Sequence, residues 1–535
     1  MDTAPVPEAS GSVGDPAARA RPRRSRGLLE RLDDRLSPIL VKEVRQALRG
    51  NVFKFAFWFT LVAATILGVA AIFITTGERQ FDEVGPIFFT AIFCCMAVAI
   101  QFLVPFTAFT SMGAEWEENT YDLLVLSNLR PRHIVGGKLL SAAVQTLLFF
   151  SAFGPFLVFA FLLRGVDLTV ILYLLALSLV ASLTSSVLAL ALSSLTRHRF
   201  LRILFMAALA GVLGFGTLLT IAWAIQIIQF PQALQDPDAH AFVTAQFLGI
   251  PILGVLAFAT ACSRLAHEEE NRSSGLRLLA TGCLVAGLVW MAYANRIVLD
   301  GDFLSGAGIG LLVAAALGAV VFTTEPEPLG RRTRLLVPRR PALALLAAPF
   351  LPGGARGLLL FLIHGGMVVA GAFLIHWTGP GVGQPLRQEG GLSLAVLLLY
   401  TVVYVGLPSA VLTQLTSDLR GRVVARAAIL GLFLAGLFGP WILGNMLQDR
   451  ELMKMSHPGN PAWLMDEVWD HPPMVHETAM IVVLLAAAGL ALLLNLRRVV
   501  SGLNEVLAAS AARRAREAQT PPEPAGASPD ALPEP

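Results

Sequence analysis

The sequence predicts an all-α polytopic membrane protein with about twelve transmembrane helices, cytoplasmic N- and C-termini, and an interfacial helix before the first span. Composition is the first reason: 55% of the 535 residues are hydrophobic, only 14% are charged, and the mean hydropathy is +0.67, values typical of membrane proteins. The second reason is that the apolar residues form stretches of about 20, which cross the hydrocarbon core as helices with their backbone hydrogen bonds satisfied internally. The third is an alternation of positive charge between successive loops.

Twelve apolar stretches qualify as spans, six in each half of the chain. Those of the first half lie near Val52–Thr75, Pro86–Phe109, Leu139–Leu163, Leu168–Leu195, Ile203–Ile228 and Thr244–Cys262. Those of the second half lie near Leu276–Asn295, Phe303–Thr324, Gly357–Trp377, Leu392–Leu415, Val424–Leu447 and Thr478–Leu496.

The loop charges set the orientation, because arginine and lysine concentrate in cytoplasmic loops. With the N-terminus inside, the cytoplasmic segments collect groups such as Arg197, Arg199 and Arg202, whereas the opposite segments carry isolated charges such as Arg79 and Arg164. This asymmetry holds at every alternation and predicts an even number of spans. It places the loop between the second and third spans in the cytoplasm.

The regions outside the spans bound the possible functions. No secretory signal is visible, and the Pro-rich ends cannot form a core. All four cysteines fall in or beside spans, which argues against a disulfide framework or a zinc site, and a formal net charge of +3 gives no reason to expect nucleic acid as a partner. We therefore expect a disordered cytoplasmic tail (1–27), an amphipathic interfacial helix (28–51), a six-span unit (52–262) with a cytoplasmic segment (115–138), a second membrane region of about six spans (263–512) with an outer loop (448–477), and a disordered tail (513–535).

The stretch SPILVKEVRQALRGN, which precedes the first span, predicts a short basic amphipathic helix. Its serine is a good N-cap, and its proline fits the first helical turn. Cations and apolar residues fall on opposite faces, so the helix should lie in the membrane interface with its cations toward lipid headgroups. It is either a simple anchor or a lever that passes motion from a cytoplasmic partner to the first span. The residues assigned to this helix are Ser37, Pro38, Leu40, Lys42, Glu43, Arg45 and Arg49.

The cytoplasmic segment Glu115–Lys138 reads EWEENTYDLLVLSNLRPRHIVGGK and predicts a second amphipathic helix. Three glutamates fall in its first turn, where acids complement the helix dipole. Tyr121, Leu124 and Val125 follow on one face at helical spacing, and Pro131 ends the helix. These apolar residues have no obvious intramolecular core, so they either contact another protein or dip into the lipid interface.

This segment resembles the coupling segment that follows the second span in ABC-exporter permeases of the type-2 class. There an acidic E-x-E-x-G-T stretch runs into a Leu-rich helix, then Pro, an aliphatic residue and Gly-Lys. The stretch before the first span likewise resembles the connecting helix of those permeases, and the match covers residues 37–163, with Asn119 in place of the usual Gly and Asn128 in place of a common Pro. The partner-coupling residues are then Glu115, Glu117, Glu118, Thr120, Leu123, Leu124, Leu126, Pro131, Ile134, Gly137 and Lys138, together with Tyr121 of the amphipathic face.

The resemblance implies a permease subunit of an ATP-driven ABC transporter, an exporter, in the bacterial inner membrane. A separate ATP-binding subunit would dock on the coupling segment, and two copies of the chain, or this chain with another permease, would frame the path through the bilayer. The chain has no ATP-binding motif of its own. A phosphate-binding loop needs a glycine five residues before the glycine of Gly-Lys, and a Ser or Thr after the lysine. Here Arg132 stands five residues before Gly137, and no Ser or Thr follows Lys138. We therefore expect neither enzyme activity nor a cofactor in this chain.

No internal duplication is visible in the sequence. The basic, Pro-rich stretch 324–356 lacks an E-x-E-x-x-T run, and the loop TSDLRGRVVAR is too short for a comparable helix. The second half is either a divergent half that lost the motif or a set of extra helices beside one permease unit.

Two other classes of function stay open. An ion-coupled carrier usually keeps ionisable residues inside its spans, but these spans are almost bare of them, and His364 and His376 fall nearer the ends of theirs. A membrane-embedded enzyme could use a cluster in the outer loop 448–477 that consists of His457, Asp466, Glu467, Asp470, His471 and His476. That loop is also rich in Pro and Trp, which suits an interfacial cap over the outer opening.

Overall fold

The computed structural model describes residues 38–75, 81–117, 131–163, 166–195, 199–266, 270–298, 301–378, 388–412, 419–447, 460–461, 464–465 and 475–519. In these ranges the chain is helical and has no β-strand. Eleven helices within them are long and apolar enough to cross a membrane. A further 29-residue helix, α17, has a shorter apolar stretch, Val424–Gly436. The prediction of an all-α polytopic membrane protein is confirmed.

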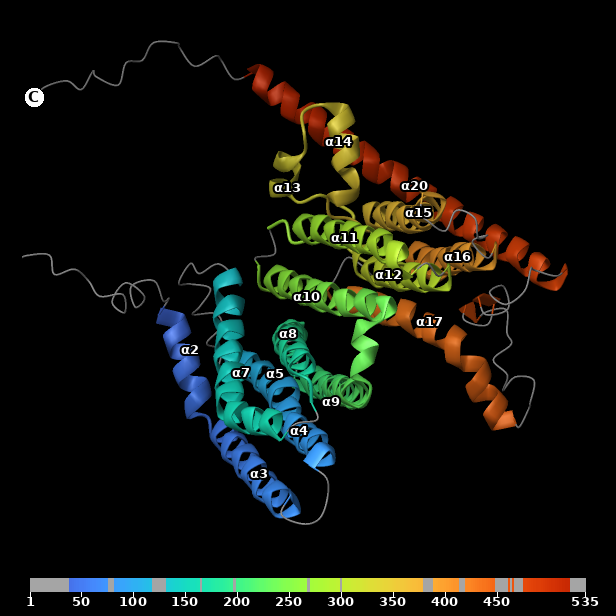
Figure 1. Cartoon of the computed structure of the whole chain (residues 1–535). Coiled ribbons are helices and arrows are strands. Elements are labelled where there is room, and N and C mark those ends of the chain that lie inside the picture. The colour runs from blue at the N-terminus through green and yellow to red at the C-terminus, as the bar shows by residue number, and fades with distance from the viewer. Residues whose placement is uncertain are drawn as a thin grey trace, which may run out of the picture.

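The helices fall into two groups along the chain, α2 to α10 and α11 to α20 (Figure 1). We call the six long helices of the first group the first unit, and the six long helices of the second group the second unit. The first group contains α2 (Pro38–Arg49), α3 (Asn51–Thr75), α4 (Phe81–Ala97), the π-helix η1 (Val98–Leu103), α5 (Val104–Glu117), α7 (Pro131–Leu162), α8 (Leu168–Ser193), α9 (Arg199–Gln229), the 3₁₀-helix η2 (Pro231–Gln235) and α10 (Pro237–Leu265). The second contains α11 (Ser274–Val298), α12 (Gly301–Phe322), α13 (Arg331–Leu336), α14 (Pro341–Ala347), the 3₁₀-helix η3 (Ala348–Phe350), α15 (Gly354–Thr378), α16 (Gln388–Val411), α17 (Leu419–Leu447) and α20 (Val475–Gln519).

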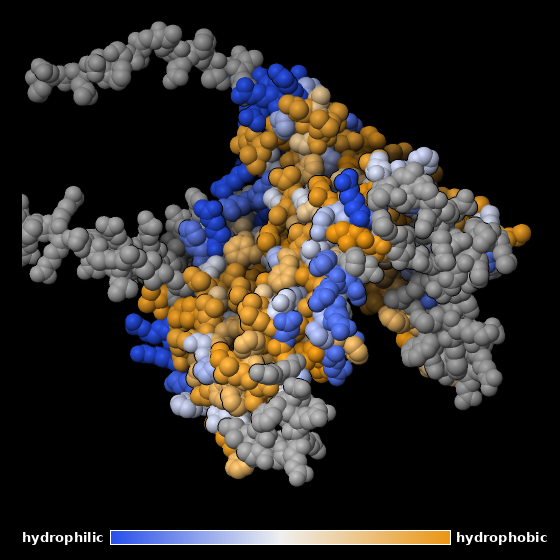
Figure 2. Space-filling model, viewed as in Figure 1, coloured by the Kyte–Doolittle hydropathy of each residue, from blue (hydrophilic) through white to orange (hydrophobic). Residues whose placement is uncertain are grey.

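Each unit packs around its own apolar core. In the first unit the largest cluster is aromatic, with Phe89, Phe93, Phe149 and Phe153 fully buried among α4, α7 and their neighbours. In the second unit aliphatic side chains of α12, α15 and α16 surround Phe361. Many other large apolar side chains face outward, and hydrophobic residues dominate the visible surface (Figure 2). Lipid is as apolar as these side chains, so a membrane-spanning helix need not bury them.

The two units share one pattern of helix packing. Numbered in chain order, the six long helices are α3, α4–η1–α5, α7, α8, α9 and α10 in the first unit, and α11, α12, α15, α16, α17 and α20 in the second. In both units the first helix packs on the second and third, and the second packs on the third, fourth and fifth. The fourth packs on the third, fifth and sixth, and the sixth also packs on the third. The duplication that the sequence does not reveal is therefore present in the helix packing, and α10 against α11 joins the two units.

Most of the long helices extend beyond the stretches predicted from hydropathy, α7 and α20 among them. Pro131 starts α7, since proline is well tolerated in the first helical turn. At the other end of the chain α20 continues to Gln519, past the start of the predicted disordered tail at 513. There the guanidinium of Arg513 donates to the carbonyls of Leu335 and Val337 at 2.9 Å, so tertiary contacts hold this part of the helix.

Candidate functional site

The structure describes both ends of the predicted coupling segment but not its centre. Residues 118–130 lie outside the described ranges, and with them Glu118, Thr120, Tyr121, Leu123, Leu124 and Leu126. Ser37 also lies outside them, and the side chains of Pro38 and Leu40 are not described. The remaining predicted residues belong to three helices: Lys42, Glu43, Arg45 and Arg49 to α2; Glu115 and Glu117 to α5; and Pro131, Ile134, Gly137 and Lys138 to α7.

A buried ion cluster joins these three helices. The Nζ of Lys138 lies 2.9 Å from Oε1 of Glu115 and 3.2 Å from Oε2 of Glu43. The lysine side chain is only 3% exposed, and those of Glu43 and Glu115 are 10% and 11% exposed. Charges taken out of water this far must be paired to be tolerated. We call this arrangement the Lys138 clasp; it ties both ends of the coupling segment to the interfacial helix.

The local sequence explains how each member of the clasp is placed. Ile134 and Lys138 are four residues apart, so they lie on one face of α7, and both are buried. On α2, Glu43 is buried, whereas Lys42, Arg45 and Arg49 are exposed, and α2 packs against α7. Sequence reasoning assigned all three clasp residues to the two motifs. It did not find their contact, because Glu43 and Lys138 are 95 residues apart.

A second cation holds the last turn of α5. Arg202, near the start of α9, donates from Nη1 to the carbonyl of Gly113 at 3.1 Å and to Oε1 of Glu117 at 2.7 Å. The Glu117 side chain is 61% exposed, so its ion pair adds little stability. A β-carbon at position 113 would lie 3.3 Å from Cδ of Arg202, so a larger residue there would shift the arginine side chain by a few tenths of an ångström. From its position in the sequence Arg202 was assigned only to the positive charge of a cytoplasmic loop, and no local pattern pointed to its contact with α5.

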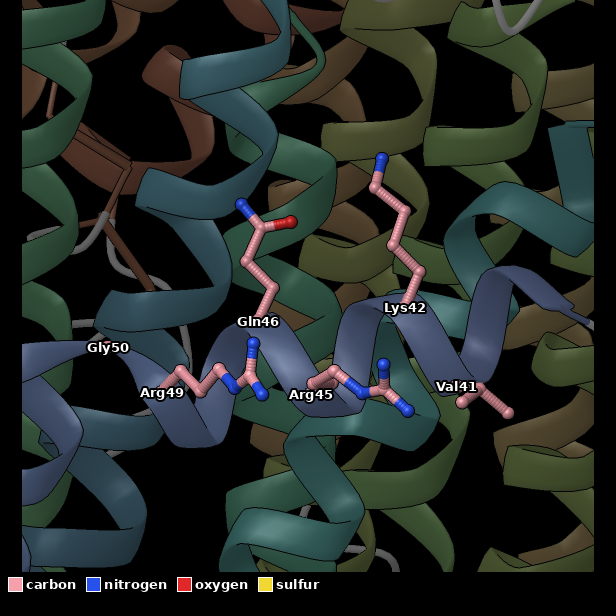
Figure 3. Close-up of a pocket in the computed structure, with 6 residues that line it drawn as sticks. All are labelled: Val41, Lys42, Arg45, Gln46, Arg49 and Gly50. Carbon is pink, nitrogen blue, oxygen red and sulfur yellow. The ribbon is translucent and has the colours of Figure 1, made fainter.

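The exposed face of α2 is strongly basic. Val41, Lys42, Arg45, Gln46, Arg49 and Gly50 line an open hollow of about 610 Å³ along this helix. Figure 3 shows Lys42 and Gln46 extending from one side of the helix, with Arg45 and Arg49 nearer the viewer. Such a surface suits anionic headgroups or the acidic surface of another protein.

The second long helix contains a π-helix deep inside the first unit. Gln101, in η1, is 3% exposed, and no hydrogen-bond partner for its Nε2 lies among the described residues. The carbonyl of Ile100 accepts a hydrogen bond from Ser182 Oγ at 2.6 Å, and that hydroxyl lies 3.0 Å from Thr146 Oγ1. Short π-helices interrupt the regular hydrogen-bond ladder and often mark functional positions. The interruption lies directly before α5, the helix that leads to the clasp.

A hollow on the first unit lies between α8, α9 and α10. It measures about 490 Å³ and is lined mainly by apolar and aromatic side chains, with Gln226 and Gln246 as its amides. At its edge Trp223 Nε1 donates to the hydroxyl of Tyr173 at 2.8 Å, and that hydroxyl donates to Gln246. The hollow can accommodate an apolar group beside a few hydrogen-bonding groups.

Two other features were expected from the sequence: a possible metal or catalytic site in the outer loop, and histidines near the ends of a span. Within the described ranges no three His, Cys, Asp or Glu side chains converge on a possible metal site, and most of the outer loop 448–477 lies outside those ranges. His364 is nearer the middle of α15 than the sequence suggested, is 4% exposed, and has its Nε2 2.8 Å from Thr281 Oγ1.

Comparison of the chain with protein-family models, with curated proteins and with solved structures finds no match in any of the three.

Proposed function

We propose that this chain is the membrane-spanning subunit of an ATP-driven transporter of the ABC type, an exporter in the bacterial inner membrane. A separate ATP-binding subunit docks on the segment 115–138, and its closure moves the spans. The observation that carries the proposal is the Lys138 clasp. A docking segment can transmit force only if it is firmly joined to the helices that must move, and the clasp ties its two ends to each other and to α2.

The path of this force follows the helices that meet at the clasp. A push on the segment reaches α5 and α7 directly and reaches α2 through Glu43. Since α2 is followed by α3 after a single residue, its displacement passes to the first span. Along the second span, the displacement meets the π-helix η1, where the hydrogen-bond ladder changes and bending is easiest. This supports the lever role of α2, in addition to anchoring through its basic face.

The docking step can be tested by substitution within the segment. Leu123→Asp combined with Leu124→Asp places two charges on the proposed apolar contact, so the ATP-binding subunit should no longer bind at this segment and the amount that co-purifies with the chain should fall. The partner to co-express is an ATP-binding protein that carries G-x-x-x-x-G-K-[ST], sought first in the neighbouring reading frames; its absence there would favour a carrier or an enzyme. Leu123→Met with Leu124→Met is the matched control, because it keeps the apolar character.

The readouts are the amount of chain in the membrane fraction, its gel-filtration profile and the amount of bound partner. Normal insertion with a reduced amount of bound partner supports the docking site. Unchanged binding by the aspartate variant overturns the assignment of the segment.

A proton-coupled carrier is the second candidate, and the buried His364 is the observation that favours it, because ionisable residues inside membranes are usually kept for function. We expect vesicles that contain the chain alone to show no His364-dependent proton flux under an imposed pH gradient. A flux that disappears in His364→Gln but persists in Thr281→Val would favour the carrier over the proposed transporter.

A further inference from the structure

The connection between the second and third helices of the second unit occupies the same place in the fold as the segment 115–138. In both units these two helices pack on each other, and each unit repeats the same set of helix pairs. The corresponding connection in the second unit is 323–353, which contains α13, α14 and η3.

A matching side-chain contact supports this correspondence. In the first unit, Arg202 of the fifth helix donates to the carbonyl of Gly113 in the last turns of the second helix. In the second unit, Arg426 of the fifth helix donates to Thr324 Oγ1 at 2.9 Å and to the carbonyl of Val321 at 3.4 Å, at the end of the second helix. The two units therefore fix the same helix ends with the same kind of group.

The base of the second connection is also held by buried ion pairs. Arg277 is fully buried; its Nη2 lies 2.6 Å from Oε2 of Glu325, and Nη1 donates to the carbonyls of Pro349 and Leu351 at 2.9 and 2.6 Å. Arg356, which is 1% exposed, donates to the carbonyl of Glu327 at 2.6 Å. These contacts tie both ends of the connection to α11 and α15, as the clasp does for the first connection.

Arg356 also ties the second connection to α20. Its Nη1 lies 3.3 Å from Oε2 of Glu505 and donates to the carbonyl of Gly502 at 3.1 Å. A displacement of this connection would therefore reach the first, third and sixth helices of the second unit together.

The connection presents leucines away from the protein. On α13 and α14, Leu336 is 62% and Leu346 is 70% exposed, whereas Val337 and Ala344 are buried against Val506 of α20. Figure 1 shows α13 and α14 at the top of the view beside the C-terminal part of α20, and Figure 2 shows apolar surface there next to the hydrophilic end of α20.

Membrane lipid is not a suitable partner for this surface. The apolar part of α20 ends at Leu496, and two arginines follow it. The connection is fixed to Ser510, which donates to the carbonyl of Arg339 at 2.7 Å, and to Arg513. At 1.5 Å per residue these residues lie about 20–25 Å further along the helix, beyond an interfacial layer of roughly 5–8 Å. The outward leucines therefore call for a protein partner.

We propose that residues 323–353 form a second docking surface for the ATP-binding subunit, so that one chain carries both docking sites of the transporter. The inference rests on the proposed function, since it names a second site for the same partner. The second unit then takes the place of a second permease chain, and the two units frame the transport path together.

The experiment measures stoichiometry. The full chain is co-expressed with the candidate ATP-binding protein identified for the docking test, and the mass of the detergent-solubilised complex is measured by native mass spectrometry. We expect one chain with two ATP-binding subunits. Leu336→Asp combined with Leu346→Asp should leave one bound subunit, Leu123→Asp combined with Leu124→Asp should also leave one, and the four substitutions together should leave none. Leu336→Met combined with Leu346→Met is the matched control.

The failures of the two proposals are distinguishable. If no ATP-binding subunit binds the wild-type chain, the proposed function is wrong and this inference falls with it. If the complex holds two chains and two subunits, and the Leu336/Leu346 aspartate variant leaves that composition unchanged, only this inference is overturned.

A second measurement keeps the test decisive if the aspartate variant fails to fold. Leu346→Cys in lipid vesicles should react with a membrane-impermeant maleimide when the chain is alone and should be protected when the ATP-binding protein is added. The native cysteines lie within α4, α10 and α11, so the unsubstituted chain serves as the blank. Protection by the bilayer alone, or no protection by the added protein, contradicts the proposal.

Discussion

Replacing Lys138 with methionine removes one positive charge from between two buried carboxylates. The two contacts, at 2.9 and 3.2 Å, each represent a Coulomb attraction of roughly 5–6 kcal/mol at an effective dielectric constant of 20. Desolvation of the three charges offsets most of this attraction in the native protein. When the cation is removed, this attraction is lost, while the two carboxylates stay desolvated and close together. We therefore expect the free energy of unfolding to fall by about 3–5 kcal/mol.

A reciprocal set of variants separates this electrostatic effect from lost packing. Glu43→Gln alone should cost less than Lys138→Met, because the lysine keeps its contact with Glu115. Lys138→Met combined with Glu43→Gln and Glu115→Gln removes the charges but keeps the shapes, so it should recover most of the lost stability. Exposed Arg45→Met on α2 is a control that should change stability by less than about 0.5 kcal/mol.

The assay is reversible unfolding of the detergent-solubilised chain in increasing SDS, followed by tryptophan fluorescence. Gel filtration of each variant checks that the starting state is folded. A loss of less than about 1 kcal/mol in Lys138→Met, well below the cost of a broken buried pair, would show that the clasp is not a buried ion cluster. A triple variant no more stable than Lys138→Met would show that packing, not charge, is what the lysine supplies.

Three further predictions concern other parts of the fold. Arg277→Met should lower the free energy of unfolding by about 3–5 kcal/mol, because it leaves the partly buried carboxylate of Glu325 without this ion pair, and Arg277→Lys should recover only part of the loss. Gly357→Ala should cost about 1–3 kcal/mol because its β-carbon would overlap a carbonyl of α12. Gly366→Ala in the same helix, where a β-carbon meets open space, should be neutral or stabilising. Deletion of Ala99 should convert η1 into regular α-helix and abolish the ATP-dependent change in distance between spin labels on α4 and α5, measured in the assembled complex.

These predictions have separate refuting outcomes. Equal stability of the two glycine variants in the SDS titration would mean that α12 and α15 do not approach as closely as the structure shows. Full recovery by Arg277→Lys would mean that a single ammonium group can replace the guanidinium contacts. An undiminished spin-label distance change after the deletion would remove η1 from the proposed path of force.

From the sequence we could predict which segments form the site, but not the contacts between them. The prediction for 115–138 used local patterns: the position of its acids, the helical spacing of its apolar residues and its proline. The amphipathic character of α2 was likewise predicted from a local pattern. Each of these patterns depends on neighbours within one or two helical turns. The partners of Glu43 and Arg202 lie on other helices, so no spacing rule in the sequence points to them. A buried lysine at the start of a span does require a counter-ion, and this was the one signal that could have suggested the clasp.

The sequence by itself determined that this is an all-α membrane protein and nearly where its helices cross. Hydrocarbon of fixed thickness imposes length and apolarity on each span, and both can be read residue by residue. Only the tertiary structure decided that Lys138 joins α2, α5 and α7, and that the second half repeats the helix packing of the first. The physical reason is that packing between helices in a bilayer depends on small residues and close fit, for which many different sequences serve. Two units can therefore share a helix-packing pattern without a visible sequence repeat.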